Sequence, residues 1–247
     1  MLMSQFASFQ NILPDPNNAI GTAGQPTGTN GPGFASVALT SEQKTLRDFT
    51  NSGRILARAV ASHRWKIKID YNPLTRDEFD IVYGFMLQRR GGIDPFFVQL
   101  PQYSLPKQAA FSTYINAQTH LIADATGVAG ATTMLLKARS GETYDNDTNG
   151  TPTAGDLFTI TSSANSNHKK TYMVTRAETD NAYNGTAVAD DRVRIHFVPG
   201  LAKATSSSDE FVFKNPLIRV IPVKDPLQYT LNSNNLFEYS LDLIEAQ

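Results

Sequence analysis

The residues best spaced for chemistry form one acidic stretch, Asp145-Asn146-Asp147-Thr148-Asn149-Gly150, followed by Asp156. Asp145, Asp147, Asn149 and Asp156 match positions 1, 3, 5 and 12 of a calcium-binding loop, with glycine at position 6. The alternative is a polar turn, because Asp, Asn and Gly are also the residues that turns require. A short Asp in place of the usual Glu, an intervening proline and the lack of flanking helical patterns favour the turn. We therefore assign no metal ligand.

Four histidines are the next candidates for catalysis or metal binding: His63, His120, His168 and His196. No two of them are close in sequence, and none belongs to a His-Glu-x-x-His motif. We expect ordinary strand or surface histidines. The chain has no cysteine, so thiolate metal sites, thiol nucleophiles and disulfides are excluded together.

Other enzyme classes lack their usual markers. The sequence has no Gly-x-Ser-x-Gly elbow, no Walker-type phosphate loop and no dinucleotide-binding glycine pattern. Paired carboxylates could still be brought together by the fold, but Asp77, Glu78 and Asp80 are explained by the preference for negative charge in the first turn of a helix. We predict no catalytic residue and no cofactor-binding residue.

Composition limits the partners. Lys and Arg total 22 against 23 Asp and Glu, so the net charge of −1 disfavours nucleic-acid binding as the main function. No window approaches the ~18 uninterrupted apolar residues of a membrane span, and we expect a soluble, untargeted chain. Charged residues make up 18%, below the ~25% of an average domain. A weakly charged surface of this kind suits contacts between subunits.

The elements that must position any site begin after a proline- and glycine-rich stretch at residues 11–34, which penalises regular structure. We assign residues 1–34 to an extended N-terminal arm, either loose or ordered against a neighbouring subunit. Residues 54–61 and 65–71, separated by Ser62-His63-Arg64, predict a long antiparallel hairpin. Its second strand alternates cleanly, with Trp65, Ile67, Ile69 and Tyr71 on one face.

A helix is predicted over residues 76–90. Thr75 can cap it, Glu78 can return the bond, and Gly91-Gly92 supplies a left-handed stop. The strand 96–100 follows, closed by Pro101.

Residues 119–213 have the pattern of an inserted small β-barrel or sandwich domain, because short strands alternate with polar turns. Six strands are predicted there, at residues 120–124, 134–138, 156–161, 170–175, 192–198 and 210–213. Residues 35–118 and 214–247 form the other domain. The strands 217–223 and 236–244 belong to it, and the second should rejoin its sheet.

Five basic residues cluster on the predicted hairpin: Arg54, Arg58, Arg64, Lys66 and Lys68. They indicate either a rim that pairs with an acidic neighbour or a solvated strand face whose charges discourage aggregation.

One part of this pattern resembles distal-tail and minor-tail proteins of tailed bacteriophages, and two others resemble modules found in phage virion proteins. The first runs from residue 64 to residue 101 and includes Asn72-Pro73-Leu74-Thr75, Arg90-Gly91-Gly92 and Asp94-Pro95-Phe96. The others are residues 154–160 and 170–175 of the insert and the ending at 237–246. The resemblance covers most of the chain beyond the arm.

The resemblance implies a mainly β (α+β) fold: a tail-tube-like antiparallel β-sandwich with one principal α-helix, plus the inserted domain. It implies a non-enzymatic subunit of the virion, assembled in the host cytoplasm. The subunit would form a hexameric ring at the distal tail or baseplate that joins the tail tube protein to the baseplate hub and other baseplate proteins. A ring also removes open sheet edges, and the hairpin and the arm are the natural donors. No cofactor, specific nucleic acid or membrane is expected.

Two alternatives remain open. One is a carbohydrate-binding or hydrolysing β module, in which the insert is lectin-like and Trp65 or exposed tyrosines stack on sugar rings. The other is a different ring of the same axis, a tail tube or terminator protein.

Overall fold

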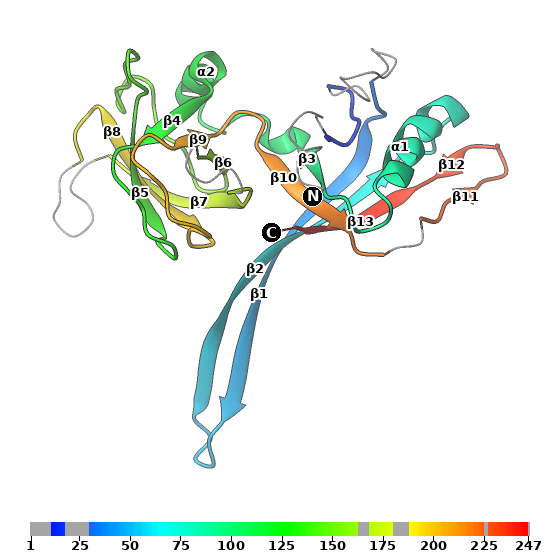
Figure 1. Ribbon diagram of the computed structural model, residues 1–247, viewed down its shortest axis with the longest axis horizontal. Coiled ribbons are helices and arrows are strands. Elements are labelled where there is room, and N and C mark those ends of the chain that lie inside the picture. The colour runs from blue at the N-terminus through cyan, green and yellow to red at the C-terminus, as the bar shows by residue number, and fades with distance from the viewer. Residues whose placement is uncertain (1–10, 18–29, 163–167, 180–187, 225–226, 247) are drawn as a thin grey trace, which may run out of the picture. The chain divides into compact units, whose positions relative to one another are not determined.

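The computed structural model describes residues 11–17, 30–162, 168–179, 188–224 and 227–246. The chain divides into two compact units, Met1–Val98 with Arg219–Ala246 and Gln99–Ile218 (Figure 1). The predicted insert, residues 119–213, lies wholly within the second unit. Strands dominate both units, so the predicted mainly β fold with an inserted small β domain is confirmed.

The first unit is built on a five-stranded sheet of order β1-β2-β13-β10-β3. Its strands are β1 (Phe34–Phe49), β2 (Ile55–Tyr71), β3 (Phe96–Gln99), β10 (Leu217–Pro222) and β13 (Ser240–Glu245). The last strand pairs with both β2 and β10, which confirms that the C-terminal strand rejoins this sheet. Between β10 and β13 in the sequence, β11 (Thr230–Leu231) and β12 (Phe237–Glu238) form a separate two-stranded ribbon.

The hairpin differs from the prediction. Residues 54–61 and 65–71 are not its two arms, because β2 runs unbroken through Ser62-His63-Arg64 and its partner is β1, after a turn at residues 50–54. The polar segment Ser62-His63-Arg64 is therefore part of a strand and not a turn. The hairpin turns at Gly53 instead, because the turn needs a residue in the left-handed region and Gly53 has a φ of 77°. The predicted alternation is confirmed: Trp65, Ile67, Ile69 and Tyr71 are all buried.

Helix α1 (Arg76–Gln88) begins where the capping pattern predicted. The backbone amide and the hydroxyl of Thr75 donate to the Glu78 carboxylate at 2.9 and 2.8 Å, which lowers the pKa of that carboxyl. Phe79, Val82, Phe85 and Met86 form the buried face. The helix ends two residues before its predicted limit, because Arg90 and Gly91 both take a positive φ.

The two edges of the sheet differ. Residues 11–13 lie parallel to β3 and cover its outer edge: the Leu13 amide donates to the Phe97 carbonyl at 2.8 Å, and the Phe97 amide donates to the Asn11 carbonyl at 2.6 Å. Leu13 is 1% exposed. The described part of the arm is thus extended and ordered against its own chain. In the described residues, the outer edge of β1 has no partner strand.

The second unit is a closed barrel with strand order β4-β5-β8-β7-β6-β9. Its strands follow the six predicted segments closely: β4 (His120–Ala123), β5 (Thr133–Lys137), β6 (Leu157–Thr161), β7 (Thr171–Glu178), β8 (Arg192–Val198) and β9 (Glu210–Val212). Two further elements were not predicted, the 3-10 turn η1 (Pro101–Tyr103) and the helix α2 (Ala109–Gln118).

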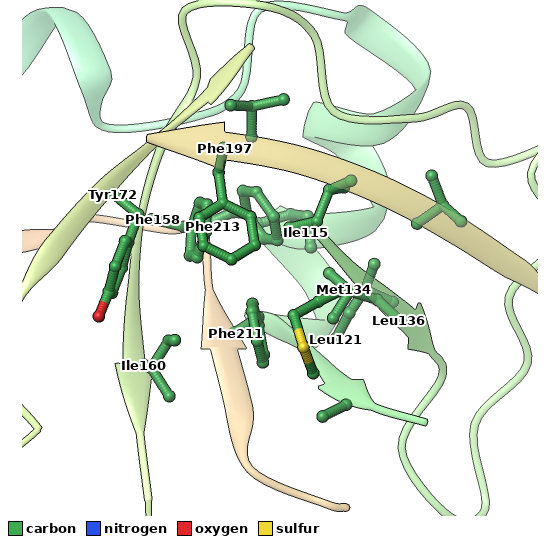
Figure 2. Packing of buried hydrophobic residues seen from close by; sticks show 14 of the residues in the cluster. Ile115, Leu121, Met134, Leu136, Phe158, Ile160, Tyr172, Phe197, Phe211 and Phe213 are labelled. Atoms are coloured by element: carbon green, nitrogen blue, oxygen red, sulfur yellow. The ribbon is translucent and has the colours of Figure 1, made fainter. Parts of the chain in front are cut away.

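Aromatic rings fill the barrel (Figure 2). The ring of Phe158 lies 5.3–5.4 Å, centroid to centroid, from those of Tyr172, Phe197, Phe211 and Phe213. Phe111 and Ile115 of α2 are fully buried in the same cluster, so this helix belongs to the barrel core. The interior is therefore packed with side chains.

Candidate assembly surface

The open edge of β1 leads into a hairpin that projects from the sheet (Figure 1). Near its base, β2 is sandwiched between β1 and β13, and Trp65, Ile67 and Ile69 face the core. Beyond His63 only β1 and β2 remain, paired from Thr45↔Ala59 to Phe49↔Ile55. This two-stranded part has no third strand on either side among the described residues.

The end of the hairpin exposes four large apolar side chains. Leu46, Phe49, Ile55 and Leu56 are 64%, 68%, 60% and 54% exposed, and we call them the hairpin tip. The register puts Phe49 and Ile55 on one face and Leu46 and Leu56 on the other. Exposed apolar clusters of this kind mark interaction sites in soluble proteins. Sequence reasoning missed the tip, because its apolar residues follow no single period.

Four of the five residues of the predicted basic cluster form two separate groups. Lys66 pairs with Glu42 at 3.1 Å and Lys68 with Asp70 at 3.4 Å, in partly exposed positions. These two fit the interpretation of a solvated strand face, and exposed pairs stabilise little. Arg54 and Arg58 lie instead at the hairpin tip, where they form no ion pair within the described residues. For Arg54 and Arg58, the prediction of a basic rim that pairs with an acidic neighbouring subunit still stands.

The residues considered as calcium ligands instead accept hydrogen bonds from backbone amides in loops. Asp145 accepts the amides of Asp147 and Thr148 at 2.9 and 3.1 Å, and Asn149 accepts the amide of Asp145 at 2.9 Å. Asp156 is buried and accepts the amides of Lys107 at 3.0 Å and Thr153 at 2.7 Å. The Asp156 carboxylate thus connects Lys107, near the start of the second unit, to the loop that precedes β6. The described residues hold no group of three or more His, Asp or Glu that could bind a metal.

The histidines lie apart. His63 contacts Ser41 at 2.9 Å, and His120 lies 3.6 Å from Glu210. His168 is buried against the Tyr172 hydroxyl at 2.6 Å, and this burial lowers its pKa to about 4. None of these environments places a base against a nucleophile and an open pocket.

His196 belongs to a buried ionic cluster that sequence reasoning did not anticipate. Glu178 is 1% exposed at its side chain and lies 3.3 Å from Arg194 and 3.1 Å from His196, and it also pairs with Arg176. All four residues come from β7 and β8, which are adjacent in the barrel. The cluster fastens these two strands. A buried carboxylate needs such partners, so its role is structural.

Trp65 does not offer a sugar-stacking surface. It is 3% exposed, its indole meets the His63 ring edge-on at 4.7 Å, and its backbone amide donates to Glu245. The carbohydrate alternative therefore loses its only tryptophan.

Neither α1 nor α2 is long and apolar enough to cross a membrane, and these are the helices of the described chain.

Comparison with known proteins finds similarity to a phage tail protein. Residues 13–103, which contain the hairpin, α1 and β3, match the family model described as "Distal tail protein pb9, A domain, N-terminal". The chain is 29% identical over 223 residues to distal tail protein pb9 of Escherichia phage T5, covering 87% of this chain and 93% of that protein. The resemblance to phage distal tail proteins is thereby confirmed. The pb9-like sequence supports a structural role in a phage tail, in association with other tail components. It spans both units and is not confined to the A-domain segment.

Proposed function

We propose that this chain is a ring-forming structural subunit at the distal end of a phage tail, where it joins the tail tube to the baseplate hub. The observation that carries the proposal is the asymmetry of the first sheet. Residues 11–13 cover the β3 edge, whereas no strand of the described residues pairs with the outer edge of the sixteen-residue strand β1. A long open edge invites pairing with another chain.

The asymmetry also favours a ring. If the β1 edges of two copies paired with each other, the result would be a closed dimer with twofold symmetry. Pairing of β1 with a different surface of the next copy is head-to-tail, and head-to-tail contacts close into rings when the rotation allows. Six copies are what the resemblance to distal tail proteins implies. Function would then be geometric, with no catalytic residue and no cofactor.

The proposed partners are a second copy of the chain, the tail tube protein, the baseplate hub and other baseplate proteins. The proposed location is the tail of the virion, after assembly in the host cytoplasm. A tail tube or terminator ring would use the same sheet edge, and binding to isolated tubes distinguishes an end-capping ring from a tube subunit.

The test uses the full chain with and without purified tail tubes, observed by native mass spectrometry and negative-stain electron microscopy. We expect a discrete cyclic oligomer, formed either at high concentration or on the tube, and located at one end of the tube. A chain that stays monomeric at every concentration and does not bind tubes would contradict the proposal. Copies distributed along the whole tube would favour a tube protein instead.

A further inference from the structure

The hairpin tip is apolar and basic. Residues 44–58 carry four basic side chains, Lys44, Arg47, Arg54 and Arg58, against the single acid Asp48, a net charge of +3. None of the four forms an ion pair with another described residue. A two-stranded ribbon alone in water is marginally stable, and one that exposes large apolar groups on both faces is less favourable still. We therefore expect the hairpin tip to bind a surface that is both apolar and acidic.

The same unit carries a groove with those properties. It has a volume of about 500 Å³ and is formed by the end of β2, the start of β13 and the β11–β12 ribbon. Its apolar walls come from Tyr71, Pro73, Tyr229 and Tyr239. Its charged groups are the carboxylates of Asp70 and Glu238, and no described lysine or arginine lines it.

Further aromatic rings pack behind the wall of the groove. The Tyr229 ring packs against Phe79 at 4.9 Å and against Phe237 at 5.5 Å, and Phe79 and Phe237 stack at 4.4 Å. Tyr229 nevertheless remains 47% exposed. Glu238 is exposed and in no ion pair with a described residue, whereas the Asp70 side chain is 39% exposed beside Lys68. Exposed aromatic rings next to carboxylates suit apolar side chains accompanied by arginines.

The tip cannot reach its own groove. Ile55 and Asp70 stand at opposite ends of the continuous strand β2. At ~3.3 Å per residue, the distance along the strand is about 50 Å. Whatever tip fills the groove must come from another molecule.

We infer that the hairpin tip of one copy docks into the groove of a second copy, with Phe49 and Ile55 against Tyr229 and with Arg47, which lies on the same face, toward Asp70 and Glu238. The inference rests on the proposed function and names the contact by which copies join. Tip and groove are different surfaces of one unit, so the contact is head-to-tail and can continue around a ring. It would act together with the open β1 edge.

The absence of cysteine allows a direct test, because introduced cysteines are then the only thiols. A full chain with Ile55→Cys and Gln228→Cys is oxidised under assembly conditions and run on a non-reducing gel. We expect a ladder of covalent oligomers beyond the dimer, since each copy carries both partners. The matched control pairs Ile55→Cys with Arg139→Cys, an exposed position on the barrel unit, and should give no ladder.

A charge exchange gives a second readout. Arg47→Glu alone and Glu238→Arg alone should each reduce assembly at least tenfold, and the double variant should restore it. Arg139→Glu is the control for the charge change and should assemble like the unmodified chain. If the unmodified chain forms rings, but the chain with Ile55→Cys and Gln228→Cys gives no ladder and the charge variants assemble normally, the docking is overturned while the proposed function stands. If no ring forms with or without tubes, both fail.

Discussion

Leu13 donates its backbone amide to the carbonyl of Phe97 at 2.8 Å, and this hydrogen bond closes one edge of the main sheet. The closure depends on a tight crossing of two segments, in which the Gly31 amide donates to the Asp15 carbonyl at 3.0 Å. A Cβ on Gly31 would stand 2.3 Å from the Pro14 carbonyl carbon. The edge opposite, β1, has no such cover in the described chain.

Gly31→Ala should destabilise the first unit, because the added methyl group collides with backbone that cannot move aside. We expect a loss of about 1–3 kcal/mol in the free energy of unfolding, measured by urea denaturation. Gly33→Ala is the matched control, since its Cβ would meet only a Pro16 side-chain carbon at 3.7 Å, an ordinary contact. Equal stability of the two variants would show that the crossing is not tight in solution.

Proline scanning of β1 separates folding from assembly. Thr40 and Ser41 are neighbours with exposed side chains, and one of their two amides points toward β2 while the other points outward. Proline at the inward position should lower the melting temperature. Proline at the outward position should leave the melting temperature nearly unchanged and abolish assembly. Two variants that both assemble normally would exclude β1 pairing between copies.

His168 makes the barrel unit sensitive to acid. Its pKa is lowered from the ordinary 6.5 to about 4 by burial, so between these values the unfolded chain binds a proton that the folded chain does not. Stability is thus fully present above pH 6.5 and decreases as pH falls toward 4, by an amount on the order of 3 kcal/mol. His168→Gln should flatten the pH dependence of unfolding in this window. Tyr172→Phe, which removes the hydrogen bond but keeps the imidazole, should retain the dependence.

Asp156 should matter for stability without any metal. Asp156→Ala leaves the buried amides of Lys107 and Thr153 without their acceptor, at a cost of about 1–3 kcal/mol. Asp145→Ala, in an exposed turn, should cost less. Calcium and EDTA should leave the melting temperature of the unmodified chain unchanged. A rise with calcium that Asp145→Ala removes would restore the calcium interpretation.

The sequence predicts those elements whose residues alternate between core and solvent. Trp65, Ile67 and Ile69 repeat with period two and lie in the core as expected, and the six barrel strands follow the same rule. Strand β1 could not be predicted in this way, because most of its side chains are exposed on both faces and so show no alternation. Helix α2 escapes because Gln108 precedes it without a side-chain cap and its buried residues are aromatic and β-branched.

The candidate assembly surface was only partly visible in the sequence. The basic residues of the hairpin stand out by composition, and Arg54 and Arg58 prove to lie at its tip. Ile55 and Leu56 fall within the strand predicted over residues 54–61, and nothing local distinguishes a core strand from one that projects without cover. Leu46 and Phe49 precede every predicted strand. The groove is assembled from residues near 70 and near 230, which only the fold brings together.

The most direct test of the account is hydrogen–deuterium exchange along β1 in the free chain and in the assembled ring. Amides of residues 34–43 that point away from β2 should exchange rapidly in the free chain and become protected on assembly, because a neighbouring copy completes the edge. The amides of Leu13 and Phe97 should be protected in both states, since they already donate hydrogen bonds at the covered β3 edge. A ring in which the outward β1 amides exchange as fast as in the free chain would contradict the account.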